Sequence, residues 1–125
     1  MDRRTFLGNS ALVASGMMAG IDPLAAQRRF GPNDTLQIGV IGTGDRGGGL
    51  INLMQQFPQF EVVAGCDILP FRLEKAMSWA GKGAKAYRDY RKLLDDKNVD
   101  AVVVATPLSM HHEMVLDVLE AGKHI

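Results

Sequence analysis

Apolar residues fall into two patterns along this chain, and the two patterns alternate. Short continuous apolar runs, of which the β-branched run at 99–105 is the strongest, predict strands buried on both faces of a sheet. Between these runs, apolar residues recur at helical spacing, as they do from Leu73 to Ala80. The predicted elements are, in chain order, a strand at 36–41, a helix at 46–57, a strand at 60–66, a helix at 70–80, a strand at 84–87, a helix at 90–94, a strand at 99–105, a helix at 110–121 and the start of a further strand at 123–125.

Residues that favour turns and helix ends support this division. Pro70 suits the first turn of a helix, and Asp89 and Ser109 suit helix N-caps, because their side chains can accept from free backbone N–H groups. Gly122 is the expected C-terminal stop of the last helix. The strict alternation predicts an α/β fold of the Rossmann type, a doubly wound parallel sheet in the order βαβαβαβαβ with right-handed crossovers.

The break between the first strand and the first helix carries the pattern Gly-x-Gly-x-x-Gly at Gly42, Gly44 and Gly47. Gly42 would make the tight turn that leaves the strand, Gly44 would let the backbone approach a pyrophosphate, and Gly47 would let the helix pack closely on the strand. The first N–H groups of that helix have no partner within it and suit an anion. The spacing predicts a dinucleotide phosphate site; the alternative is that these glycines serve turns and packing alone.

An acidic residue follows the second strand, where a dinucleotide site needs one. Asp67 stands about 20 residues after the glycine loop, and a carboxylate there can accept both hydroxyls of the adenosine ribose. Its charge favours NAD, since it would repel the 2′-phosphate of NADP, although Arg72 close by would soften that repulsion and leave NADP open. Gly42, Asp67 and Thr106 all fall at the carboxyl ends of predicted strands, the edge at which such sheets bind ligands. The alternative for Asp67 is a residue that only leads into the next helix.

The first 26 residues predict an export signal outside the fold. Arg3 and Arg4 form a twin-arginine pattern, and the apolar stretch at 11–21 is shorter than the roughly 20 residues that span a bilayer. Together they predict a bacterial Tat signal, the Tat export machinery as a partner and a periplasmic or extracellular location. The alternative is a frayed helix with two chance arginines. A polar linker at 27–35 would join this segment to an NAD(P)-binding domain at 36–125.

Composition narrows the classes of partner. The 14 basic and 14 acidic side chains balance, so the chain has no charge excess for nucleic acid or an anionic membrane. Cys66 is the only cysteine, which excludes an internal disulfide and suggests a small core residue. No Cys/His spacing indicates a metal site.

The chain resembles a known family from residue 36 to residue 125. The similarity lies in the glycine loop, the Cys66-Asp67 pair, and the blocks at 87–94, 99–107 and 120–125. In these blocks the chain looks like the N-terminal domain of the glucose–fructose oxidoreductase / inositol dehydrogenase / MocA family. The resemblance implies an NAD(P)-binding domain followed by a larger α/β domain, with catalytic residues that come after position 125. The domain is therefore expected to be incomplete at its C-terminus, and alone to bind a dinucleotide weakly without catalysis.

The same resemblance adds residues to the expected cofactor site. Thr106, Pro107 and His111 match a Thr-Pro-x-x-x-His pattern that lies near the nicotinamide ribose in the family. The alternative for His111 is a helix-start residue that bonds the preceding loop. The predicted cofactor-binding residues are Gly42, Thr43, Gly44, Asp45, Arg46, Gly47, Asp67, Thr106, Pro107 and His111, with NAD as the cofactor, NADP as the second candidate and no metal.

Three hypotheses for function follow. The first is an exported NAD-dependent oxidoreductase that transfers a hydride to or from a sugar or polyol, with a homo-oligomer among its expected assemblies. The second is an NAD-dependent glycosidase, because Tat-signalled members of the family with a Gly-x-Gly-x-Arg-Gly loop look similar and this chain has Arg46 in that position. The third is a dinucleotide-binding protein without catalysis.

Overall fold

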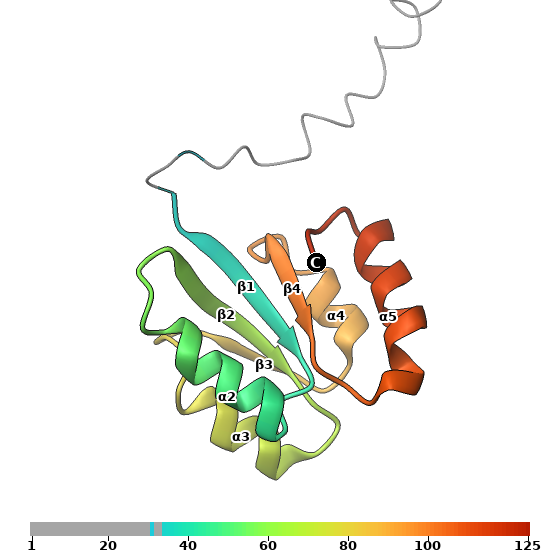
Figure 1. The fold of residues 1–125 in the computed structure, drawn as a ribbon, viewed down its shortest axis with the longest axis horizontal. Coiled ribbons are helices and arrows are strands. Elements are labelled where there is room, and N and C mark those ends of the chain that lie inside the picture. Colours follow the sequence, from blue (N-terminus) through green and yellow to red (C-terminus); the bar gives the residue numbers. More distant parts are fainter. Residues whose placement is uncertain (1–30, 32–33) are drawn as a thin grey trace, which may run out of the picture.

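The structure, a computed structural model, describes residue 31 and residues 34–125. Its centre is a parallel sheet of four strands in the order β3-β2-β1-β4 (Figure 1). The strands are β1 (Leu36–Ile41), β2 (Phe60–Cys66), β3 (Lys85–Tyr87) and β4 (Ala101–Val104). A helix follows each strand, so the predicted α/β fold with a doubly wound parallel sheet is confirmed.

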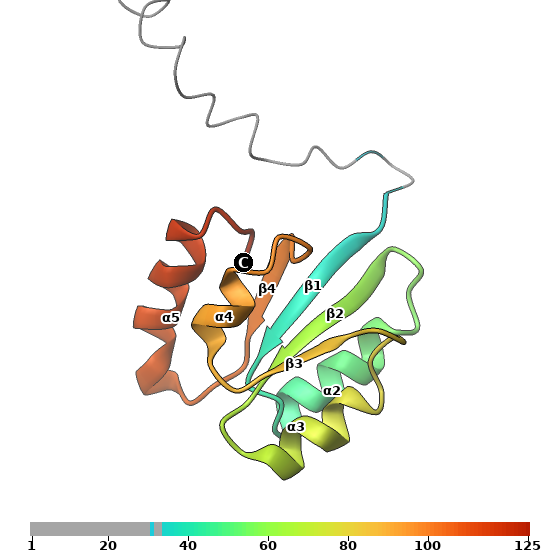
Figure 2. The same ribbon diagram turned by 180° about the vertical axis from the view of Figure 1, so that it is seen from behind.

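The helices cover the two faces of the sheet. They are α2 (Asp45–Met54), α3 (Pro70–Met77), α4 (Tyr90–Leu94) and α5 (Leu108–Glu120). One apolar cluster joins α2 and α3 to the sheet through Ile51 and Ala76, and a second joins α4 and α5 to it through Leu93 and Val118. Figures 1 and 2 show the two helix pairs lying apart, with the strands between them.

Because the register between β1 and β2 is irregular, neighbouring side chains of β2 belong to different apolar clusters. Ile38 pairs with Val62, but the next residue, Gly39, pairs with Ala64, so β2 holds one extra residue at this point. Such a bulge reverses the alternation of side chains, which explains why Val62 lies in the cluster of α2 and Ala64 in that of α4 and α5.

Strand β1 has a neighbour on each side. On the β4 side, Gln37 N–H donates to Asp100 Oδ2 at 3.1 Å, and Asp100 N–H donates to the Gln37 carbonyl at 2.9 Å. The two residues stand 63 positions apart in the chain. Beyond β4, His124 forms a parallel bridge with Ala101, which agrees with the strand predicted to start at 123–125.

Several predicted boundaries are confirmed. The structure has β1 and β2 at the predicted residues, and α4 follows an N-cap at Asp89, whose side chain accepts from Arg91 N–H at 3.0 Å. Gly122 ends α5 with a φ of 72°, the left-handed conformation that glycine adopts without strain.

Two expectations at the last strand and helix are wrong. Ser109 is not an N-cap: α5 starts at Leu108, and Pro107 precedes it with no side-chain cap. The ring of Pro107 fixes its φ angle at a value that suits the residue before a helix. The helix therefore starts directly after Pro107, two residues earlier than an N-cap at Ser109 would place it. Strand β4 is not buried on both faces, since only Val102 is fully buried and β4 lies at the edge of the described sheet.

The helices α2 and α3 end earlier than predicted, at Met54 and Met77, and turns follow them. None of the helices at residues 34–125 is long and apolar enough to cross a bilayer. The predicted Tat segment and most of the predicted linker lie outside the described residues.

Candidate functional site

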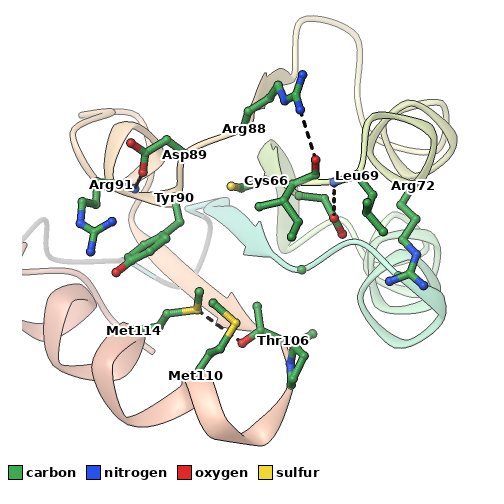
Figure 3. A pocket seen from close by; sticks show the side chains of 16 residues that line it. Cys66, Leu69, Arg72, Arg88, Asp89, Tyr90, Arg91, Thr106, Met110 and Met114 are labelled. Atoms are coloured by element: carbon green, nitrogen blue, oxygen red, sulfur yellow. Dashed lines mark hydrogen bonds between the residues drawn. The ribbon is translucent and has the colours of Figure 1, made fainter.

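A cavity of about 400 Å³ opens at the carboxyl ends of the strands. Its walls come from the turn after β1, the segment after β2, the start of α4, and the segment from β4 into α5 (Figure 3). Five of the ten predicted cofactor residues line it, namely Gly42, Gly44, Asp67, Thr106 and Pro107. Three strand ends thus meet at one cavity, as the sheet topology requires.

The turn after β1 is built on Gly42. Its φ is 89°, a conformation that L side chains rarely adopt, and a Cβ there would lie 2.7 Å from the Ala105 carbonyl oxygen. Gly42 N–H also donates to the Cys66 carbonyl at 2.8 Å, which ties the turn to the end of β2. The predicted turn glycine is therefore required by both conformation and space.

Helix α2 starts against this turn. A Cβ at Gly47 would lie 1.7 Å from the Gly42 carbonyl oxygen, so the first turn of the helix and the end of the strand touch through backbone atoms. The helix begins after Gly44, and no side chain caps it. Its first N–H groups therefore carry the positive end of the helix dipole at the cavity edge without a side-chain acceptor.

Asp67 is fixed by three hydrogen bonds. Its Oδ2 accepts from Thr43 N–H at 2.9 Å and from Thr43 Oγ1 at 3.2 Å, and its Oδ1 accepts from Leu69 N–H at 2.9 Å. The carboxylate is half-buried and lines the cavity. The sequence placed Asp67 and the glycine loop at one edge, and the structure joins them directly through Thr43.

Two arginines line the same cavity as this carboxylate. The Arg72 guanidinium lies over the glycine loop, with Nη1 3.4 Å from the position of a Cβ on Gly44. Arg88 Nη2 donates to the Ile68 carbonyl at 3.3 Å, on the other side of Leu69 from Arg72 (Figure 3). Sequence reasoning named Arg72 but missed Arg88, because Arg88 precedes a predicted helix and only the fold brings it to Ile68.

One part of the cavity wall is largely apolar. Tyr90, Met110 and Met114 line it, and Figure 3 shows these side chains gathered on one side of the cavity. Tyr90 is held by a 2.6 Å hydrogen bond from its hydroxyl to Asp117 on α5. That hydrogen bond and burial raise the pKa of Tyr90 to about 12. Helical spacing alone marks Met110 and Met114 as packing residues, so this wall could not be predicted from the sequence.

The remaining predicted residues surround the cavity without lining it. Thr43 is buried, with 3% of its surface exposed, and Gly47 lies inside the packing of α2. Asp45 and Arg46 are exposed residues in the first turn of α2. His111 Nε2 lies 2.7 Å from the Thr106 carbonyl oxygen. This contact is the one expected from the alternative interpretation of His111, a helix-start residue that bonds the preceding loop.

Cys66 lies at the base of the cavity and is 3% exposed. Burial, together with the Asp67 and Asp89 carboxylates, raises the pKa of its thiol to about 11. No group of residues within 34–125 has the composition of a metal site.

We expect Cys66 to resist alkylation. At about pH 8 a thiol with this pKa is ionised in about one molecule in a thousand, against about one in ten for an unshifted thiol. Iodoacetamide should therefore modify the native chain at least about 100-fold more slowly than the urea-unfolded chain, as followed by mass spectrometry. Equal rates would contradict the buried position of the thiol.

Comparisons with known proteins agree with this site. Residues 36–125 match the family model of the GFO_IDH_MocA oxidoreductases, described as an NAD-binding Rossmann fold. A glycosyl hydrolase family 109 protein of Stenotrophomonas maltophilia is 37% identical over 98% of this chain and 28% of its own length. An inositol 2-dehydrogenase/D-chiro-inositol 3-dehydrogenase of Lactiplantibacillus plantarum is 36% identical over 70% of this chain and 25% of its own length.

Solved structures give the same result. The myo-inositol dehydrogenase of Lactobacillus casei, crystallised with NAD(H) and myo-inositol, superposes with a TM-score of 0.66 at 37% identity. The match covers 71% of this chain and 26% of that one. The chain thus spans about a quarter of the length of the proteins it matches. It belongs to the GFO/IDH/MocA oxidoreductase family, and residues 36–125 carry the family's NAD-binding Rossmann domain.

Proposed function

We propose that this chain is the cofactor-binding part of an exported enzyme that transfers a hydride between NAD and a sugar or polyol. The observation that carries the proposal is the fixed Asp67 carboxylate beside the glycine loop and the uncapped start of α2, on one edge of a cavity. A carboxylate and a helix N-terminus at this spacing suit the ribose and the diphosphate of one dinucleotide.

Different residues of the site would contact different parts of the cofactor. The N–H groups at the start of α2 and the Arg72 guanidinium would hold the diphosphate, and Asp67 would accept from the adenosine ribose. The apolar wall of Tyr90, Met110 and Met114 would exclude water from the adenine side. Thr106 and Pro107, at the end of β4, would border the nicotinamide half.

The nicotinamide, when bound, accepts or gives the hydride, and the protein supplies binding, orientation and proton transfer. Inositol dehydrogenases among the relatives and the solved structures support a polyhydroxylated ring as the substrate class. The Arg3-Arg4 pattern supports export. The groups that move the substrate proton would lie outside the residues of this domain.

A glycosidase is the second candidate, and two observations favour it. The relative that covers 98% of this chain carries the name of glycosyl hydrolase family 109, and the loop has Arg46 in the Gly-x-Gly-x-Arg-Gly position. A glycosidase of this kind would use NAD to oxidise the sugar transiently and reduce it again after the glycosidic bond breaks. The two candidates therefore differ in net NADH and not in how the cofactor is held.

Two assays on the whole protein that carries this domain can distinguish the dehydrogenase from the glycosidase. With NAD and a panel of polyols, a dehydrogenase should accumulate NADH, which is measured by its absorbance. With a nitrophenyl glycoside, a glycosidase should release nitrophenol with no net NADH. Nitrophenol release without NADH formation on any polyol would overturn the dehydrogenase proposal. The absence of both activities, with NAD bound, would favour a dinucleotide-binding protein without catalysis.

A further inference from the structure

We propose that Thr43 is a positioning residue for Asp67 and that its hydroxyl sets the preference for NAD over NADP. The inference rests on the proposed role of Asp67 at the adenosine ribose. Thr43 is the middle residue of Gly42-Thr43-Gly44, a position that the glycine pattern leaves open to any residue. The residue type at position 43 is therefore not restricted by the glycine pattern, whereas positions 42 and 44 require glycine.

The first step is that Thr43 faces Asp67 and not the cavity. Its side chain is 3% exposed and is the buried polar side chain of the described core. Its Oγ1 lies 3.2 Å from Asp67 Oδ2, and its N–H lies 2.9 Å from the same oxygen. A hydroxyl this deeply buried can act on a ligand only through the group it bonds.

The second step concerns the acceptor capacity of Asp67. A carboxylate offers about four lone-pair directions, two on each oxygen. Thr43 fills both directions on Oδ2, and Leu69 N–H fills one on Oδ1. The direction left on Oδ1 is the one open to a ribose hydroxyl. The Thr43 hydroxyl thus adds a third bond to the two backbone N–H bonds on this carboxylate, and it further restricts rotation of the carboxylate and the position of its charge.

The third step concerns the positively charged groups near the proposed position of the ribose. Arg72 and Arg88 line the same cavity on the two sides of the segment that follows Asp67. Both guanidinium groups are suited to a phosphate. A firmly held Asp67 carboxylate opposes that attraction and repels a 2′-phosphate, whereas a carboxylate held only by the two backbone N–H groups can move further from the phosphate and repel it less. Discrimination between the two cofactors therefore depends on how firmly Thr43 holds Asp67.

The test compares Thr43→Val, which keeps the branched shape and removes the hydroxyl, with Thr43→Ser, which keeps the hydroxyl. The dissociation constants of NAD and NADP are measured on the full chain by calorimetry. We expect Thr43→Val to lower the ratio of the NADP constant to the NAD constant about fivefold, the effect of one hydrogen bond of about 1 kcal/mol. Thr43→Ser should keep the ratio within about twofold of the parent.

A purely structural role for Thr43 would weaken both cofactors equally and leave the ratio unchanged, so an unchanged ratio in Thr43→Val overturns the inference. If Thr43→Val does not fold, Thr43→Ala replaces it with the same expectation. Asp67→Asn separates this inference from the proposed function. A ratio that changes in Asp67→Asn but not in Thr43→Val refutes the role of Thr43 alone. A ratio unchanged in both refutes the role of Asp67 as well.

Discussion

Replacing Gly47 with alanine should lower the free energy of unfolding by about 3 kcal/mol or more. The added Cβ would lie 1.7 Å from the Gly42 carbonyl oxygen, far inside the contact distance of any two atoms. The atom it meets is backbone, so no side-chain rotation can relieve the overlap, and α2 must move away from the end of β1. Since a domain of this size is stable by only about 5–15 kcal/mol, this is a large fraction of its stability. Urea denaturation followed by circular dichroism measures the change.

Gly49→Ala is the matched control for this prediction. Gly49 lies two residues further along the same helix, and a Cβ there meets no atom within 4 Å. Because alanine favours a helix over glycine, this variant should be more stable than the parent by about 0.5–1 kcal/mol. The same chemical change should therefore act in opposite directions at the two positions. A Gly47→Ala chain as stable as the parent would show that the strand and helix do not meet as closely as the structure has them.

Replacing Asp67 with asparagine should weaken NAD binding by about tenfold to a hundredfold. The change keeps the size of the side chain but removes the charge that would accept from the ribose, and it turns an NH₂ group toward one of the three donors that Asp67 now accepts. NADP binding should weaken less or improve, because the repulsion of the 2′-phosphate is lost and Arg72 and Arg88 remain. Calorimetric titration with each cofactor gives both constants.

Asp89→Asn is the corresponding control. Asp89 lines the same cavity and bears the same charge, but its side chain caps α4 through Arg91 N–H, a role that asparagine also fills. We expect its NAD affinity to stay within about threefold of the parent, because a solvent-screened charge without a proposed bond to the cofactor acts weakly. Equal losses in the two variants would mean that net charge in the cavity matters and that Asp67 has no specific role. Thermal melts of both variants identify any loss that comes from unfolding.

Most of the sheet could be predicted because its signals are local. Strands β1 and β2 have the predicted bounds, since a short apolar run between glycine- or proline-containing turns leaves little choice of register. The Asp89 cap and the Gly122 stop were likewise predicted, each from one residue type that suits one backbone conformation. The start of α5 could not be predicted, because either Pro107 or Ser109 could precede the first turn of the helix. Which of them does so depends on where β4 ends.

The candidate site could be predicted only in part. The meeting of the glycine loop and Asp67, which we propose hold the phosphate and the ribose, could be predicted from spacing, because both stand at strand ends. The hydrogen bonds from Thr43 and the apolar wall around Tyr90 join segments that are far apart in the chain. Such contacts produce no periodic pattern in the sequence, so they could not be predicted from it. For His111 the sequence left two interpretations open, and the structure shows its ring in contact with the Thr106 carbonyl, as expected of a helix-start residue that bonds the preceding loop.

The position of β1 between β2 and β4 has a consequence for synthesis of the chain. The β4 side of β1 stays unpaired until residues 63 positions later, such as the Asp100 partner of Gln37, have left the ribosome. At usual translation rates that interval is on the order of 3–13 s. During it, the nascent chain carries a bare edge of Leu36–Ile41, the kind of strand that templates aggregation.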